Sequence, residues 1–296
     1  MRRTILLLAT ASLVLLLVGG VAASKQREDQ STTSSESPTT TTDKSGGDVS
    51  IESTTQKASF TNGSGANYLR VAVSDHGNLT GFESPFGIFQ NSGGEGYALC
   101  SNAGATVHGY DVAGSEAGFG TPTFAQPNGA GTFPLTVTRN TTDGKFKLTQ
   151  VWAKPDAVEK DVTVTMTVQN LSSSTINNVF LNRGGDFDIG TTTQDWGALT
   201  GDSAFQWDDR IGGSDSPATG LRLTALTFAT SHGPDIDTFS QWNPQGTENR
   251  ALHCDDFTEL TPTTTGTRDL AMRVVYKLGN LSAQQSKTVK YEYGRM

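Results

Sequence analysis

The sequence predicts an all-β protein: a large antiparallel β-sandwich, preceded by a signal peptide and a disordered Ser/Thr-rich segment. The clearest strand is 162–169, where VTVTMTVQ alternates apolar with polar side chains, the period-two pattern of a strand with one buried face. Glycine is frequent, at 33 residues, and hydrophobic residues make up only 34% of the chain, a composition typical of short strands joined by turns. Only 250–260 has a pattern compatible with a short helix.

Residues 1–23 have the parts of a secretory signal peptide. Arg2 and Arg3 precede the apolar run 5–18, and Val21, Ala22 and Ala23 supply the small residues of a cleavage site. We therefore expect cleavage after Ala23 and a secreted or extracellular protein. The alternative is an uncleaved membrane anchor that holds the domain outside the cell, because about 20 apolar residues span a bilayer. No later run is apolar enough for a membrane span.

Residues 24–57 are rich in serine, threonine and charge, and they contain almost no side chain that could be buried. Such a segment cannot offset its ordering entropy, so we expect a disordered linker. A folded β-sandwich domain is predicted for 58–296. Because no linker-like break divides it, one domain is favoured over two smaller sandwiches that meet near Asp156.

Short apolar alternations between Gly, Asn, Asp and Pro residues predict the remaining strands. In chain order these are 68–73, 79–83, 96–100, 106–112, 133–139, 145–152, 176–181, 221–229, 272–278 and 288–293. We expect 162–169 and 176–181 to form a strand pair through the polar turn 170–175. The last two strands are expected to form a closing hairpin around Gly279 and Asn280.

Charge and cysteine content restrict the function class. The formal net charge is −8, and it becomes −10 once Arg2 and Arg3 leave with the signal peptide, which argues against nucleic acid as a partner. The two cysteines, Cys100 and Cys254, would reach an oxidising compartment, where a disulfide is expected. The alternative is two buried free thiols. One Cys-His pair at 253–254 lacks the spaced partners of a zinc site, so no metal is assigned there.

Five asparagines occur in N-glycosylation acceptor motifs. They are Asn62, Asn78, Asn140, Asn170 and Asn280, and four of them lie on predicted turns. These sites have meaning only in a host with the export-coupled transferase.

The stretch 162–181 is an alternating strand, an Asn-Leu-Ser-Ser-Ser turn and an Asn-Asn-Val return, and the early hairpin 77–85 reads GNLTGFESP. Both resemble galactose mutarotase-like β-supersandwich domains of carbohydrate-active proteins, although the strand-turn-strand phrase is also similar to bacterial immunoglobulin-like surface repeats. The resemblance implies a supersandwich-like fold. Enzymes of that family use histidines and a carboxylate in a concave sheet, and His76, His108, His232 and His253 do not match them one by one. No catalytic residue is therefore assigned.

Two loops carry the candidate binding residues. The first loop begins at Gly184, after the two central strands, and the second loop is 231–256. Indole rings stack on the apolar face of a sugar, while carboxylates accept hydrogen bonds from its hydroxyls. We therefore predict a carbohydrate site where the two loops meet, with Trp196, Trp207 and Trp242 as stacking platforms and Asp186, Asp188 and Asp195 as hydroxyl acceptors. The alternative is that the tryptophans plug the ends of the core and the aspartates make turns.

Three other chemistries fit less well. Asp186, Asp188 and Gly190 could bind a structural Ca²⁺, but the loop lacks the ligands of an EF-hand, and no cofactor is assigned. The same two aspartates are the candidate glycosidase pair. His76, Asp111 and Ser203 follow the order of a trypsin-like triad, but Ala204 and Phe205 stand where an oxyanion loop needs glycines.

The sequence thus predicts a secreted or surface β-sandwich that acts as a binding or interaction module, with carbohydrate as the expected partner, and it favours a protein without enzymatic activity. Two alternatives stay open. One is a glycan-active enzyme of mutarotase-like fold, and the other is a structural envelope or matrix protein without a small ligand.

Overall fold

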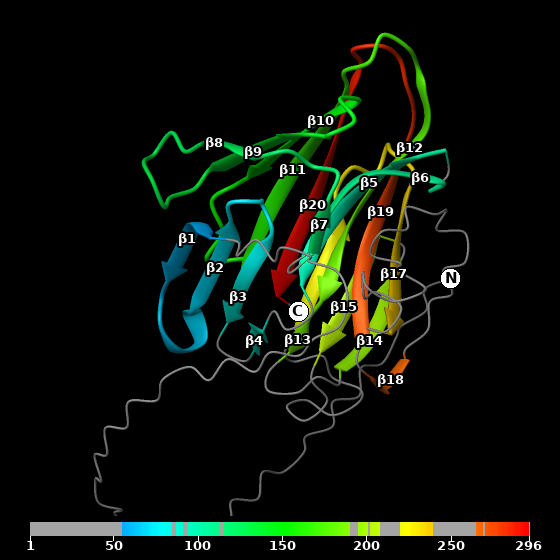
Figure 1. Ribbon diagram of the computed structural model, residues 1–296. Helices are drawn as coiled ribbons and strands as arrows, with labels where there is room; N and C mark the ends of the chain where they lie inside the picture. The colour runs from blue at the N-terminus through cyan, green and yellow to red at the C-terminus, as the bar shows by residue number, and fades with distance from the viewer. Residues whose placement is uncertain are drawn as a thin grey trace, which may run out of the picture. The chain divides into compact units, whose positions relative to one another are not determined.

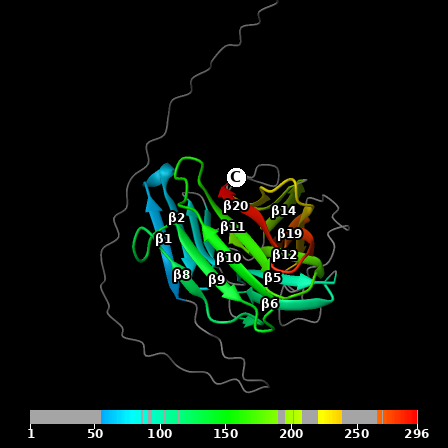
Figure 2. The ribbon, with the colours of Figure 1, turned by 90° about the horizontal axis from the view of Figure 1, so that it is seen from above.

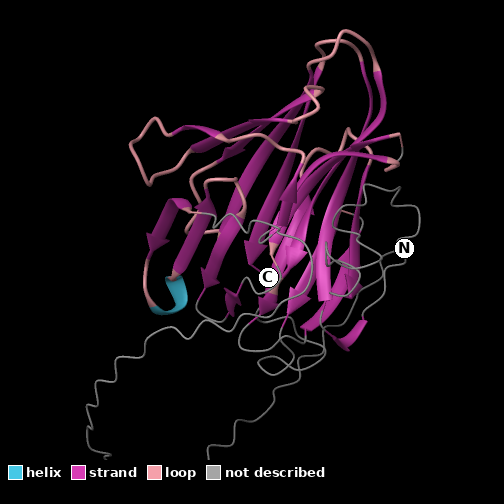
Figure 3. Cartoon of the chain, in the orientation of Figure 1, coloured by secondary structure: helices cyan, strands magenta, loops and turns pink. Residues whose placement is uncertain are grey.

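The computed structural model describes residues 55–84, 87–90, 94–102, 104–112, 115–189, 195–200, 202–207, 220–238, 265–268 and 270–295. All of them belong to the unit Asp48–Met296. Strands dominate this part of the chain, and its only helical element is the 3-10 turn η1 (Gly65–Asn67) (Figure 3). The all-β prediction is confirmed. The predicted signal peptide and the window 250–260 lie outside the described residues. Within the described ranges, no helix is long and apolar enough to cross a bilayer.

The described strands form three sheets in which neighbouring strands are antiparallel (Figure 1). The nine-stranded sheet has the order β18 (Thr265–Arg268), β14 (Asp195–Thr200), β15 (Ser203–Trp207), β16 (Gly220–Ala225), β20 (Ser286–Arg295), β11 (Asp161–Asn170), β10 (Phe146–Trp152), β9 (Leu135–Asn140) and β8 (Thr123–Ala125). The six-stranded sheet has the order β17 (His232–Thr238), β19 (Leu270–Leu281), β12 (Ile176–Asp186), β5 (Glu95–Ser101), β6 (Thr106–Val112) and β7 (Ser115–Ala117). The five-stranded sheet has the order β1 (Gln56–Asn62), β2 (Leu69–Ser74), β3 (Leu79–Ser84), β4 (Gly87–Gln90) and β13 (Asp188–Ile189).

The nine-stranded and six-stranded sheets pack face to face, with β10, β11 and β20 in one layer and β5, β12 and β19 in the other (Figure 2). In β11 the four alternating apolar residues Val162, Val164, Met166 and Val168 are fully buried, and the polar residues between them are half-buried. A strand with one core face and one solvent face has this pattern, so the central prediction is confirmed.

Strand β12 is buried on both faces from Val179 to Asp186. The prediction ended this strand near Leu181 and began a loop at Gly184, which is wrong. A β-carbon at Gly184 would lie 2.2 Å from the carbonyl oxygen of Met272, so only glycine allows β12 and β19 to approach this closely. Gly184 and Gly185 therefore lie inside β12 and do not end it.

In each of the two strand pairs predicted from the sequence, the two strands lie in different sheets. β11 lies in the nine-stranded sheet and β12 in the six-stranded sheet, and the same is true of β20 and β19. The last connection also turns at 282–285, because Gly279 and Asn280 belong to β19. Neither connection is a hairpin, since each passes from one layer of the sandwich to the other.

One hydrophobic cluster draws residues from all three sheets, including Val71 of β2, Trp152 of β10 and Tyr276 of β19. A polar network lies inside it. Arg183 is fully buried, and its guanidinium contacts the Glu95 carboxylate at 2.8 Å and lies 4.7 Å from the centre of the Trp152 ring. A buried charge of this kind is tolerated only when it is paired and fully hydrogen-bonded.

The turn between β2 and β3 is held by this interior network. The carbonyl of Gly77 accepts hydrogen bonds from Arg183 Nη2 at 3.0 Å and from Trp152 Nε1 at 3.2 Å. The carbonyl of His76 accepts bonds from the Tyr97 hydroxyl at 2.8 Å and from Gln150 Nε2 at 3.2 Å. The early hairpin is therefore a structural part of the core, and its tip carries a histidine into the interior.

Candidate functional site

The first tryptophan-bearing segment contains strands that the sequence analysis did not predict. Trp196 lies in β14 and Trp207 in β15, and the two residues are direct partners across these antiparallel strands. Their side chains lie outside the described part, and Trp242 is outside it altogether. The stacking roles of the three tryptophans stay predictions.

The two segments expected to meet do so at described residues. The Nε2 atom of His232, at the start of β17, lies 2.8 Å from Oδ1 of Asp202, in the turn between β14 and β15. Close packing continues along the strands, since a β-carbon on Gly197 of β14 would lie 3.0 Å from Ile236 of β17. β14 and β17 are edge-region strands of the two facing sheets, so their contact brings the two segments to one end of the sandwich.

The three predicted hydroxyl acceptors are distributed over three sheets. Asp186 ends β12, Asp188 begins β13, and Asp195 begins β14. The residue between the first two, Phe187, is fully buried and packs edge-on against Tyr293 at 6.1 Å. Asp186 and Asp188, the candidate glycosidase pair, therefore belong to different strands of different sheets. Their roles in ligand, Ca²⁺ or substrate chemistry stay predictions.

Asp186 belongs to a group of buried polar side chains on the six-stranded sheet, on the face turned away from the main core. The group contains Asn182, Asp186, Asp235 and Arg273, each at most 9% exposed. Arg273 donates from Nε to Oδ2 of Asp235 at 2.9 Å, and its Nη2 lies 2.7 Å from the same oxygen. Neither Asn182 nor Arg273 belongs to a sequence motif, so neither was predicted as a site residue. A ligand that uses Asp186 would have to reach a carboxylate that is 3% exposed.

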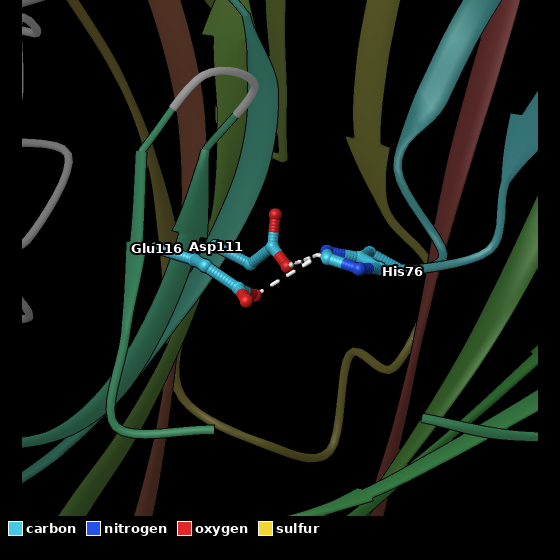
Figure 4. Close-up of side chains that lie close together, drawn as sticks. All are labelled: His76, Asp111 and Glu116. Atoms are coloured by element: carbon cyan, nitrogen blue, oxygen red, sulfur yellow. Dashed lines mark hydrogen bonds and ion pairs between the residues drawn. The ribbon is translucent and has the colours of Figure 1, made fainter. Parts of the chain in front are cut away.

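A second cluster of titratable groups surrounds His76. Its Nδ1 atom lies 2.8 Å from Oδ2 of Asp111 and 3.3 Å from Oε2 of Glu116 (Figure 4). The carboxylates come from β6 and β7, and both point toward the histidine at the tip of the β2–β3 turn. Their ligand atoms lie within 4.8 Å of one another, which is close enough to hold a metal ion.

The neighbours of this cluster argue for a charge-paired structural network. The guanidinium of Arg139 bonds Asp111 and contacts Glu116 at 2.6 Å, so both carboxylates already face a cation. Asn78 donates from Nδ2 to Oδ1 of Asp111 at 2.7 Å. A metal ion at this place would have to displace Arg139, whose side chain is 2% exposed. The cluster therefore fixes the β2–β3 turn to β6 and β9.

The pKa values agree with this interpretation. Hydrogen bonding to Asp111, and then to Glu116, raises the pKa of His76 to about 10, so its ring is an imidazolium at neutral pH. Burial alone would raise the pKa of Glu116, but its bonds to His76, Asp111 and Arg139 hold that pKa well below its ordinary range. A protonated histidine cannot bind a metal ion.

The trypsin-like order His76, Asp111, Ser203 is assembled only in part. His76 and Asp111 are bonded as such a triad requires, whereas Ser203 lies in β15 and its hydroxyl bonds the hydroxyl of Thr224 at 2.9 Å. The proposed serine is thus part of a cross-strand pair in another region of the sandwich.

The predicted modification sites differ in exposure. Asn62, Asn140 and Asn280 are exposed, whereas Asn78 and Asn170 are at most 1% exposed and use their Nδ2 atoms in internal hydrogen bonds. A glycan at either buried position would have to break those bonds. Cys100 lies fully buried in β5, and Cys254 is outside the described residues, so the disulfide stays a prediction.

No protein-family model and no curated protein sequence matches this chain. Among solved structures it is similar to a bacterial glucoamylase complexed with acarbose, with a TM-score of 0.50 and 10% identity over 82% of this chain and 34% of that one. It is also similar to a galactose mutarotase related enzyme from Lactobacillus acidophilus (TM-score 0.34, 10% identity, 80% and 97% covered) and to a polysaccharide lyase (TM-score 0.35, 9% identity, 82% and 32% covered).

The chain has a β-rich fold similar to part of that glucoamylase. The glucoamylase match carries this conclusion, and at 10% identity it concerns the fold alone. The chain spans about a third of the length of that glucoamylase. The resemblance to the β-rich folds of carbohydrate-active proteins is thereby confirmed at the level of the fold, and the function has to be argued from this chain's own residues.

Proposed function

We propose that this chain is a secreted or cell-surface module that binds carbohydrate through the β14–β15 hairpin. The observation that carries the proposal is the direct pairing of Trp196 with Trp207. Direct partners on antiparallel strands share one face of a sheet, so this register puts both tryptophan positions on the same face of the hairpin. Adjacent aromatic rings on one sheet face suit the repeating apolar faces of a sugar chain.

The neighbouring positions support a polar rim around that platform. Phe205, two residues before Trp207, is half-buried and is paired with Arg222 of β16. Arg222 in turn lies 2.6 Å from the carboxylate of Glu292 on β20. Sugar recognition combines stacking with charged hydrogen-bonding groups, and both kinds of group lie along this part of the nine-stranded sheet.

A binding experiment with matched variants tests the proposal. Purified protein would be screened on a glycan array, and its affinity for the best ligand would be measured for wild type, Trp196→Ala, Trp207→Ala and Phe124→Ala. Phe124 is 39% exposed on β8, at the opposite edge of the same sheet, and serves as the control. We expect roughly tenfold weaker binding or worse for each tryptophan variant and no change for the control. Wild-type protein that retains no glycan, or equal affinity in all four proteins, would exclude this site.

Export is the second part of the proposal, and it rests on the sequence of residues 1–23. Mass spectrometry of protein recovered from its own host should give a mature chain that begins at Ser24. Peptide mapping without reduction should show Cys100 linked to Cys254. An intact amino terminus in the membrane fraction would support the anchored alternative, and alkylation of both thiols in native protein would exclude the disulfide.

A further inference from the structure

A third polar cluster lies apart from the residues discussed so far. The hydroxyl oxygen of Ser101 lies 2.8 Å from Nε2 of His108, and Nδ1 of the same histidine lies 2.7 Å from Oδ2 of Asp143. Ser101 ends β5, His108 lies in β6, and Asp143 lies in the turn between β9 and β10. A serine, a histidine and an aspartate bonded in this order have the geometry of a nucleophile, a general base and a residue that orients the base.

The proton positions follow from the partners. Hydrogen bonds from Thr141, His108 and Lys145 outweigh the effect of burial and keep the pKa of Asp143 below its ordinary value, so its carboxylate can only accept. In a neutral imidazole Nδ1 must then carry the proton, which leaves Nε2 to accept from the hydroxyl of Ser101. That tautomer is the one a general base requires.

The local backbone explains how these side chains meet. The register of β5 with β6 shifts between Leu99 and Cys100, which pair with Gly109 and Val107, so His108 is the extra residue of a β-bulge. A bulge redirects a side chain, and here it brings His108 to the same side as Ser101. The ring of His108 also packs edge-on against Phe146 at 4.7 Å, and this contact fixes its orientation.

The carboxylate that orients the histidine is held in place as well. Oδ1 of Asp143 accepts a bond from the Thr141 hydroxyl at 2.6 Å and one from the backbone N–H of Lys145 at 3.0 Å. Its other oxygen is therefore directed at His108. A relay whose members are each fixed by a further contact is typical of a preorganised site.

The relay borders a cavity of about 280 Å³. Its lining includes five hydroxyl side chains, those of Ser101, Thr106, Ser172, Ser174 and Thr175. Asn102, Asn177 and Lys145 also line it, and Nζ of Lys145 lies 3.7 Å from Oδ2 of Asp143. The volume is several times the roughly 30 Å³ that one water occupies in the liquid, so a small molecule fits. The lining suits a polar, uncharged or anionic compound, and both reacting groups, Ser101 and His108, form part of the wall.

We propose that Ser101, His108 and Asp143 form a nucleophilic triad that hydrolyses short-chain carboxylic esters of polyhydroxy compounds, such as acetyl esters. The Ser101 oxygen attacks the ester carbonyl carbon while its proton passes to Nε2 of His108, and that proton then leaves with the alcohol. Water, deprotonated by His108, attacks the acyl-serine, releases the carboxylic acid and restores the hydroxyl of Ser101. Lys145, which lines the same pocket, supplies positive charge for the oxyanion.

This activity goes beyond the proposed carbohydrate binding and does not depend on it, because no residue is shared with the β14–β15 hairpin. Loss of glycan binding in the tryptophan variants should leave ester hydrolysis unchanged. Conversely, absence of hydrolysis would leave the glycan-array result unaffected. The two experiments can therefore fail independently.

The test uses the purified chain and p-nitrophenyl acetate as the probe. We expect turnover that Ser101→Ala reduces at least about 100-fold, with Ser59→Ala, an exposed serine on β1 of the five-stranded sheet, as the control that keeps wild-type turnover. Asp143→Asn should lower kcat while KM stays constant, because Asp143 positions His108 and does not touch the ester. Turnover no faster than buffer, or turnover unchanged in Ser101→Ala, would overturn the proposal.

Covalent labelling keeps the test decisive if Ser101→Ala fails to fold. Wild-type protein would be treated with a fluorophosphonate and mapped by peptide mass spectrometry. A label on Ser101 that disappears in Asp143→Asn supports the triad. No label, or a label only on another serine, overturns it.

Discussion

The side-chain amide of Asn170 donates a hydrogen bond to the backbone carbonyl of Leu281 over 3.0 Å, and this bond joins the end of β11 to the end of β19. The same Nδ2 atom reaches the carbonyls of Ser174 at 2.7 Å and Ser282 at 3.1 Å, while Oδ1 accepts from Ser172. These acceptors lie at the two connections that pass between the facing sheets. One buried asparagine thus fixes the distance between both layers of the sandwich at this end.

Replacement of Asn170 by alanine should therefore destabilise the fold. Buried carbonyls at both connections would lose their donor, and we expect a loss of about 1 to 3 kcal/mol in the free energy of unfolding, measured by urea denaturation. Asn62→Ala is the matched control, because it also removes a glycosylation motif but at an exposed position. Equal loss in the two variants would show that the effect comes from a missing glycan instead of the hydrogen bonds.

The buried pair of Arg183 and Glu95 gives a second prediction. Arg183→Met should cost about 3 to 5 kcal/mol, because it leaves the Glu95 carboxylate buried and uncompensated. Adding Glu95→Gln should recover part of that loss. In the control, Arg222→Met breaks a half-exposed pair with Glu292 and should cost about 1 kcal/mol or less. Urea midpoints that show no recovery in the double variant would contradict this account.

The sequence predicted features that depend on neighbouring residues better than features that depend on residues far apart in the chain. The alternation of Val162, Val164, Met166 and Val168 is local, and it identified β11; likewise β6 was predicted with its observed bounds, 106–112. Strand pairing is not local. A six-residue turn such as 170–175 can close a hairpin or cross between sheets about 10 Å apart, and alternation alone does not distinguish these outcomes.

The candidate sites were harder to predict for the same reason. Trp196 and Trp207 were singled out by residue type, but the strands that pair them are short and lack a clear alternation. Ser101, His108 and Asp143 are separated by 7 and 35 residues, and no flanking motif marks them. Only the bulge at His108 and the β9–β10 turn bring them together, and a bulge has no reliable sequence signature.

The network around His76 makes the stability depend on pH. The pKa of His76 is raised from 6.5 to about 10 in the folded chain, mainly by its bond to Asp111. The folded state therefore holds a proton that the unfolded state releases, so this contribution is complete below pH 6.5 and is lost as the pH rises through about 10. In urea denaturation at pH 6, 8 and 10, His76→Gln should be destabilised most at pH 6, and its disadvantage should shrink with rising pH. A constant difference between the two proteins across this range would contradict the assignment.

The negative charge of Asp161 is unfavourable in the folded chain, so its removal should stabilise the protein at neutral pH. Burial, followed by repulsion from Glu292 and Asp156, raises its pKa from 3.8 to about 6. The folded state binds the proton more tightly, so stability from this group is present below about pH 4 and is lost as the pH rises through 6.

Asp161→Asn should therefore match wild type near pH 4 and exceed it at pH 7, by about 1 kcal/mol or less because the side chain is only half-buried. Asp143→Asn is the control with the opposite sign. Hydrogen bonds from the Thr141 hydroxyl, His108 and the backbone N–H of Lys145 outweigh burial and lower the pKa of Asp143, so its charge stabilises the fold above pH 4 and that variant should lose stability at pH 7. Thermal unfolding at pH 4 and pH 7 separates the two cases, and a shift of both variants in the same direction would contradict the repulsion at Asp161.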